Sequence, residues 1–131
     1  MSRIVLSGKF YKRGHLIPNW KLRQFELKEN KSLVYYTTTG TPRGEISLES
    51  IMLTPGVPDA VKWSHSSSKN AVSIDIHETK YAGNGEVLYN AVPLMCLVFD
   101  TNEEGKQFVE KISQITEVYK IQVEVLTLYN T

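Results

Sequence analysis

Apolar and polar residues alternate along the first part of the chain. The alternation is clear over Leu6–Lys12 and Lys21–Lys28, and residues 32–37 (Ser-Leu-Val-Tyr-Tyr-Thr) are rich in residue types that favour strands. Glu29-Asn30-Lys31 separates the last two segments at hairpin length, and a Gly-Thr-Pro turn precedes a fourth alternating segment at Gly44–Leu48. This spacing predicts a meander of four antiparallel strands.

The middle of the chain is divided into shorter segments by prolines, serines and a Gly-Asn-Gly turn. Ala71–Ile76 and Leu94–Asp100 are the clearest further strands. Weaker candidates are Ile51–Thr54, Val61–Ser64 and Val87–Ala91. About seven strands thus precede any helix, which predicts a mainly β protein with a closed or nearly closed antiparallel barrel or sandwich.

One helix is predicted near the C-terminal end, over residues 102–119. Thr101 and Glu104 have the spacing of a capping box. An apolar stripe follows at spacings of four, three and four residues, formed by Phe108, Ile112, Ile115 and Tyr119. Such a stripe has to cover an apolar surface, and the open end of the barrel provides one. Residues 120–131 fit both a strand and a continuing helix.

The length and composition indicate one globular domain over residues 1–131. The chain has 131 residues, of which 41% are hydrophobic and 22% charged. The single Cys96 excludes an internal disulfide and, with no signal-like apolar segment at the start, favours a cytoplasmic protein. The longest apolar run, Ala91–Phe99, is too short to span a bilayer.

Charge is distributed unevenly, although the formal net charge is only +1. Residues 1–25 hold six basic and no acidic residues, while the remainder holds nine basic and fourteen acidic residues. This polarity predicts an anion-binding end on an acidic body; a solvated basic strand face is the alternative.

The basic residues of the first two strands alternate with apolar ones on shared faces. Phe10 and Lys12 share a face of the first strand, and Lys21, Arg23 and Phe25 share a face of the second. On both strands the basic residues are nearer the connecting loop. A hairpin therefore gathers the cations at a rim above an apolar interior, an arrangement suited to a polyphosphorylated ligand.

These residues belong to a longer series of motifs that resembles the pleckstrin homology (PH) domain family. The motifs are Gly8-x-Phe10-x-Lys12, Trp20-Lys21-x-Arg23-x-Phe25-x-Leu27, Leu33-Val34-Tyr35-Tyr36 and Pro42-Arg43-Gly44-x-Ile46-x-Leu48. The resemblance extends over nearly the whole chain. It implies a seven-stranded, strongly bent antiparallel barrel capped by a C-terminal helix, in agreement with the pattern above. It also implies a non-catalytic module that binds phosphoinositide headgroups and is recruited peripherally to membranes.

The resemblance also implies which residues contact the headgroup. Lys12, Arg23 and Tyr35 stand at the positions that phosphoinositide-binding members use. Arg43 matches a basic residue that some members specific for 3-phosphorylated inositides use. Lys21 and Arg13 are expected to add positive field around the pocket.

The tip of the loop between the first two strands is apolar. Leu16 and Ile17 lie between the basic residues Arg13 and Lys21. Exposed apolar residues flanked by cations can enter the headgroup region of an anionic bilayer. The alternative is that Ile17 folds back onto the barrel.

Several other function classes lack support in the sequence. No nucleophile motif or paired-carboxylate motif of an enzyme is present, and no pattern for a cofactor is found. His65, His77 and Cys96 lack the spacing of metal ligands. The basic residues gather at one rim instead of forming a long stripe with aromatic residues, which argues against nucleic-acid binding.

A protein-interaction module of the same fold is the alternative function. In that case a partner peptide would add along a sheet edge beside the C-terminal helix, with weak or no lipid binding. The acidic body and the apolar tail at residues 121–128 favour this alternative.

Overall fold

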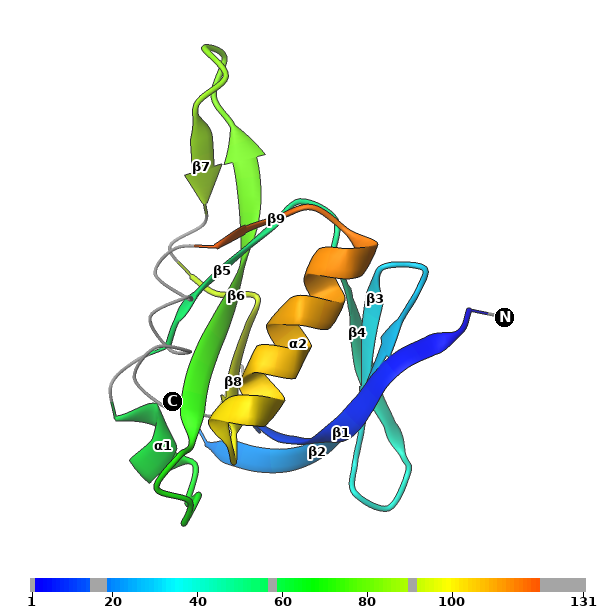
Figure 1. Cartoon of the computed structure of the whole chain (residues 1–131), viewed down its shortest axis with the longest axis vertical. Helices are drawn as coiled ribbons and strands as arrows, with labels where there is room; N and C mark the ends of the chain where they lie inside the picture. The colour runs from blue at the N-terminus through cyan, green and yellow to red at the C-terminus, as the bar shows by residue number, and fades with distance from the viewer. Residues whose placement is uncertain (1, 15–18, 57–58, 90–91, 121–131) are drawn as a thin grey trace.

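The first four strands form the predicted meander. The computed structural model describes residues 2–14, 19–56, 59–89 and 92–120. Its first sheet section consists of β1 (Ile4–Arg13), β2 (Trp20–Lys28), β3 (Ser32–Tyr36) and β4 (Pro42–Ser47), each paired antiparallel with the next. β1 and β2 are long and curve across the molecule (Figure 1).

The second sheet section contains β5 (Ile51–Pro55), β6 (Val72–Tyr81) and β8 (Met95–Phe99). β6 pairs antiparallel with both β5 and β8, and β8 joins the two sections through a short pairing with β1. The far end of β6 pairs with β7 (Val87–Tyr89), and this hairpin projects from the body as an arm (Figure 1). The seven strands other than β7 and the short β9 form a curled antiparallel half-barrel, which confirms the predicted fold class.

Val61–Ser64 does not form the predicted strand. The chain makes a short helix there, α1 (Ala60–Trp63). The Ser64 N–H donates to the Ala60 carbonyl at 2.8 Å, and Ser64 Oγ donates to the Val61 carbonyl at 2.8 Å. These local hydrogen bonds satisfy the backbone within one turn, so no neighbouring strand is needed.

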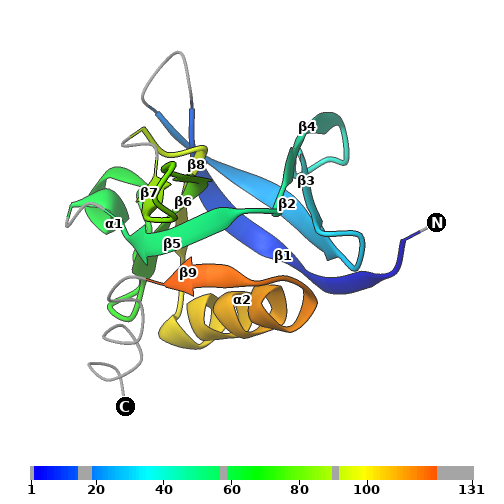
Figure 2. The same cartoon turned by 90° about the horizontal axis from the view of Figure 1, so that it is seen from above.

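The C-terminal helix α2 (Asn102–Ile115) starts as predicted but ends earlier. Thr101 Oγ1 accepts a hydrogen bond from the Glu104 N–H at 3.1 Å, as the capping motif requires. After Ile115 the backbone becomes extended, and β9 (Val118–Lys120) pairs in parallel with β5 (Figure 2). The predicted helix over 116–119 was wrong because the chain leaves the helix at Thr116 and Val118–Lys120 pair with the open edge of β5 instead.

The core is built around four phenylalanines from four elements. Phe10 lies 5.4 Å from Phe25, 4.4 Å from Phe99 and 6.1 Å from Phe108 between ring centroids. Phe108 and Ile112 bring the buried face of α2 onto this cluster. Gly105 permits the close approach, since a Cβ there would come within 2.7 Å of the Val72 side chain. The helix therefore closes the barrel as the apolar stripe predicted.

Candidate functional site

The strand register places the basic residues of β1 and β2 on one face. Lys12 is directly opposite Lys21, and Phe10 is directly opposite Arg23. Arg23 is thus the diagonal neighbour of Lys12, and it lies one step deeper along the strands. The predicted arrangement of cations above an apolar interior is present at this end of the barrel.

Lys12 is the central residue of the site. Its side chain is almost buried, with 7% of the residue exposed, and Nζ donates to the Arg13 carbonyl at 3.2 Å. Nζ also lies 4.9 Å from the centroid of the Tyr35 ring, a cation–π distance. Burial lowers the pKa of Lys12 below 10.5, and the charges of Arg23 and Arg43 lower it further.

Tyr35 and Arg43 reach the site from the next two strands. Tyr35 is opposite Phe25 on β2, with 5.7 Å between the ring centroids, and opposite Gly44 on β4. A Cβ at Gly44 would come within 2.5 Å of Tyr35 Oη, so the glycine lets the phenol lie against β4. Arg43 is exposed beside Gly44. Lys12, Lys21, Arg23, Tyr35 and Arg43 are called the mouth below.

No carboxylate neutralises the mouth in the described part of the chain. The ion pairs found there, Arg3–Glu29 and Lys80–Glu78, do not involve a mouth residue. Glu26 alternates to the other face of β2 and accepts a hydrogen bond from Tyr36 Oη at 2.9 Å. The mouth therefore carries positive charge that no carboxylate of residues 2–14, 19–56, 59–89 and 92–120 compensates.

Arg13 is separated from the other predicted ligands. It follows Lys12 on β1, so its side chain lies on the opposite face, where its charge acts on Asp75 and Cys96. There it lines a small cavity of about 190 Å³ with Gly14 and residues 92–96. The loop residues Leu16 and Ile17 lie outside the described residues.

A buried polar layer on β6 was missed at the sequence level. Ser73, Asp75, His77 and Thr79 alternate with core residues yet are all buried. His77 Nε2 lies 3.1 Å from Thr54 Oγ1. Burial raises the pKa of Asp75, and burial together with Asp75 raises the pKa of Cys96 to about 12. The alternation itself was visible, but it is the usual sign of a half-exposed strand, and only the tertiary structure covers the second face.

Comparison with known proteins identifies the family. The model of the PH domain family matches residues 4–117. This chain belongs to the PH domain family. The matched region includes every residue of the mouth. A human relative, pleckstrin-2, is 39% identical over 56 residues, which cover 39% of this chain and 16% of the relative. This chain thus aligns with a small part of that protein.

Solved structures agree with this assignment. The crystal structure of the carboxyl-terminal PH domain of pleckstrin has a TM-score of 0.57 at 24% identity, covering 88% of this chain and 98% of that domain. The same domain in complex with D-myo-Ins(1,2,3,5,6)P5 has a TM-score of 0.58 at 23% identity, covering 88% and 97%. At this level of identity the likeness establishes the fold.

PH domains are generally non-catalytic binding modules. Within residues 2–14, 19–56, 59–89 and 92–120, His, Cys, Asp and Glu side chains do not gather in threes as they would around a metal ion. No helix in these same ranges has the length and apolar character needed to cross a membrane.

Proposed function

We propose that this PH domain binds the phosphorylated inositol headgroups of phosphoinositides at the mouth. Lys12 and Arg23 contact vicinal phosphates. The two residues are diagonal neighbours on adjacent strands, and the Lys12 ammonium is nearer the β1–β2 loop than the Arg23 guanidinium. Arg43 and Tyr35 complete the pocket from β4 and β3. Lys21 and Arg13 add positive field, Lys21 from the mouth and Arg13 from the opposite face of β1.

The observation that carries this proposal is the buried, unneutralised ammonium of Lys12. A buried cation is costly unless a partner compensates it, and Lys12 has one carbonyl acceptor and an aromatic face. Arg23 and Arg43 add repulsion instead of compensation. A polyphosphate supplies negative charge and several acceptors to all three side chains at once.

The inositol pentakisphosphate complex of the pleckstrin domain supports the ligand class, because that domain has the same fold. Headgroup binding at the mouth recruits the protein that carries this domain from the cytoplasm to the membrane surface. Insertion of Leu16 and Ile17 beside the headgroup stays a prediction of the sequence.

Liposome sedimentation tests the proposal. Vesicles of phosphatidylcholine with a few per cent of a phosphoinositide should pellet the wild-type domain, and vesicles without it should not. Lys12→Ala with Arg23→Ala removes two charged contacts, so we expect affinity to fall about a hundredfold or more. Binding should also weaken as salt rises, because the mouth is open to solvent.

Arg3→Ala with Lys9→Ala is the matched control. Both residues are exposed on the same basic N-terminal segment, so the double variant loses the same net charge outside the mouth. We expect it to retain most of the affinity. Equal losses in the two double variants would reduce the effect to a general attraction between charges and would reject the mouth as the site.

In the alternative function, a partner peptide would add to a sheet edge beside the C-terminal helix, but a strand of the chain itself already occupies that edge. The edge of β5 beside α2 is already paired with β9 over Ile51–Leu53. A peptide would have to displace β9 or pair with its outer edge. A soluble inositol polyphosphate that leaves Tm unchanged at high concentration would favour protein binding over headgroup binding.

A further inference from the structure

A large groove lies beside the turn at the far end of β2, away from the β1–β2 loop. Its volume is about 1020 Å³, and its walls are the C-terminal end of α2, the turn before β5 and the base of the β6–β7 arm. Its lining includes Lys31, just beyond the far end of β2, whereas the mouth lies at the start of β2. Along β3, Lys31 is four residues from the mouth residue Tyr35, so about 14 Å at most separates their Cα atoms, and the mouth residues of β1 and β2 lie farther away.

The groove contains a buried hydroxyl with no partner among the described residues. Thr79 lines the groove and is only 4% exposed, and its Oγ1 makes no hydrogen bond there. Its backbone N–H donates to the Ser50 carbonyl at 2.8 Å, which holds Thr79 against the turn before β5. A buried polar atom without a partner is costly, so a ligand that hydrogen-bonds Thr79 recovers that cost.

The charges around the groove favour a cationic ligand. The exposed carboxylates of Glu49 and Glu117 lie on its walls, and Lys31 is the basic residue among the lining. α2 ends at Ile115 with no basic residue in its last turn, so the partial negative charge of the helix terminus is not countered there. Tyr81, which is 59% exposed, adds an aromatic surface.

We propose that this groove binds an arginine-bearing peptide segment of a partner protein. A guanidinium has the shape and the donors to engage a carboxylate in two parallel hydrogen bonds, and it stacks on aromatic rings such as Tyr81. The remaining N–H groups of the segment reach Thr79 and the end of α2. The volume is at the upper end of small-molecule sites, which suits several peptide residues. Because the groove includes the turn at the end of β2 that is away from the β1–β2 loop, the domain can hold this partner while bound to a membrane.

The test uses a defined probe, the acetylated and amidated hexapeptide Ser-Leu-Arg-Val-Arg-Ser, titrated into the full ¹⁵N-labelled chain. We expect the amide signals of Glu49–Ile51, Thr79–Tyr81 and Ser113–Val118 to shift. A peptide with both arginines replaced by citrulline keeps the shape but loses the charge and should cause no such shifts.

Charge variants locate the contact. Glu49→Gln with Glu117→Gln should weaken binding of the arginine peptide about fivefold, the scale of two exposed charge pairs. Lys31→Gln should strengthen it, because the opposing cation is removed. Glu86→Gln with Glu110→Gln, exposed carboxylates outside the groove, is the matched control and should have little effect. Lys12→Ala with Arg23→Ala should leave peptide binding intact, which separates this proposal from headgroup binding.

Four results would overturn the proposal. Equal shifts with the citrulline peptide would remove the role of arginine, and absence of any shift at millimolar peptide would remove the site. Groove shifts that depend on protein concentration alone would assign the surface to a second copy of the chain. Groove shifts on deletion of residues 121–131, with no response to the peptide, would assign it to the chain's own C-terminal segment.

Discussion

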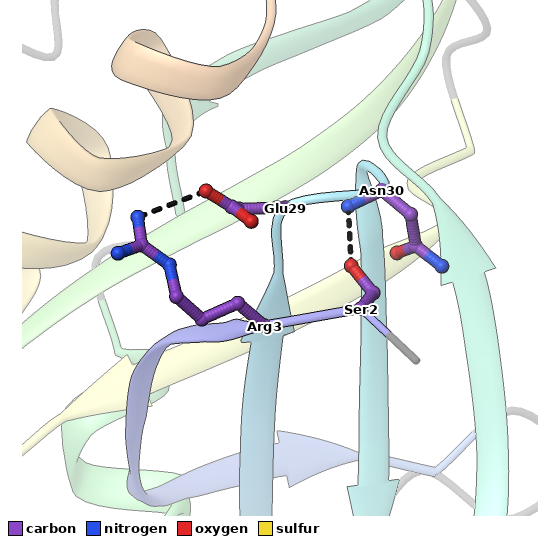
Figure 3. Close-up of polar contacts among 4 residues, drawn as sticks. All are labelled: Ser2, Arg3, Glu29 and Asn30. Atoms are coloured by element: carbon purple, nitrogen blue, oxygen red, sulfur yellow. Dashed lines mark hydrogen bonds and ion pairs between the residues drawn. The ribbon is translucent and has the colours of Figure 1, made fainter.

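The two ends of the β1–β2–β3 meander differ in whether their charged side chains have partners of opposite charge among the described residues. At the end remote from the mouth, Arg3 pairs with Glu29 at 2.9 Å and Ser2 Oγ accepts the Asn30 N–H at 2.8 Å (Figure 3). These exposed groups are solvated whether or not they pair. At the mouth, the buried Lys12 faces two guanidinium groups and no carboxylate of the described chain. Among the described residues, counter-charges are thus absent where they would contribute most, which is characteristic of a binding site and not of a stabilising one.

The largest effect should come from Lys12→Met. This variant tests whether the Lys12 charge lowers the stability of the fold while raising the affinity for the headgroup. Methionine keeps the unbranched stem and removes the buried charge. We expect headgroup affinity to fall about tenfold or more, because a charged hydrogen-bonding partner of the phosphates is lost, while Tm rises. Isothermal titration calorimetry with a soluble inositol polyphosphate and a thermal melt measure the two effects.

The pH dependence of this variant provides an internal check. The folded pKa of Lys12 lies below 10.5, so between the folded pKa and 10.5 the unfolded chain retains a proton that the folded chain has lost. The contribution of Lys12 to stability therefore rises with pH in that range, and Lys12→Met should lack this rise. Lys9→Met, at an exposed position of β1, is the control and should change neither Tm nor affinity much. A lower Tm for Lys12→Met would show that the ammonium is compensated in the folded state.

Asp75→Asn sharpens the comparison with a buried group of the opposite charge. The folded pKa of Asp75 is raised by burial, so its favourable contribution is complete below pH 3.8 and is lost as pH rises through the folded pKa. Asparagine removes the buried charge, and we expect Tm at pH 7 to rise relative to wild type, with little difference near pH 3. Differential scanning calorimetry across this range measures it.

Asp59→Asn removes an exposed carboxylate and is the control for Asp75→Asn, with little change in Tm expected at pH 7. A decrease in Tm for Asp75→Asn at pH 7 would mean that the ionised carboxylate is stabilised in the folded state by the Cys96 thiol, His77 and Arg13, which all act to lower its pKa. The polar layer of β6 would then be an ionic anchor for the start of the β1–β2 loop.

Arg3→Ala should have the smallest effect. The side chains of Arg3 and Glu29 are 74% and 49% exposed, so the pair contributes less than about 1 kcal/mol to the free energy of unfolding. Urea denaturation should detect little change, and headgroup affinity should be nearly unaltered because Arg3 is remote from the mouth. A large loss of stability would show that the contact between Arg3 and Glu29 in Figure 3 holds the start of β1 in register with the end of β2.

The strands and the capped helix were predictable because their signals are local. Alternation fixed the faces of β1 and β2, and Thr101 with Glu104 marked the start of α2. The mistakes occurred where local signals are weak or shared. Val61–Ser64 is too short to distinguish a strand from a helical turn, and the apolar spacing through Tyr119 fits both a helix and the observed β9.

The mouth was predicted in part from periodicity and in part from family resemblance. Shared strand faces indicated Lys12, Lys21 and Arg23, whereas Tyr35 and Arg43 came from the resemblance alone. Arg13 is adjacent to Lys12 in sequence, and the pleat that brings one side chain into the mouth turns the other to the opposite face.

By itself the sequence determined which side chains share a face of each strand, because a period of two is a property of the extended backbone. It also determined the start of the C-terminal helix and the concentration of positive charge in the first 25 residues. Only the tertiary structure decided that Lys12 is buried with no counter-charge from the described residues, that both faces of β6 are covered, and that β9 pairs with β5. These depend on which distant segments come to lie against a strand, and no local pattern encodes burial by a remote part of the chain.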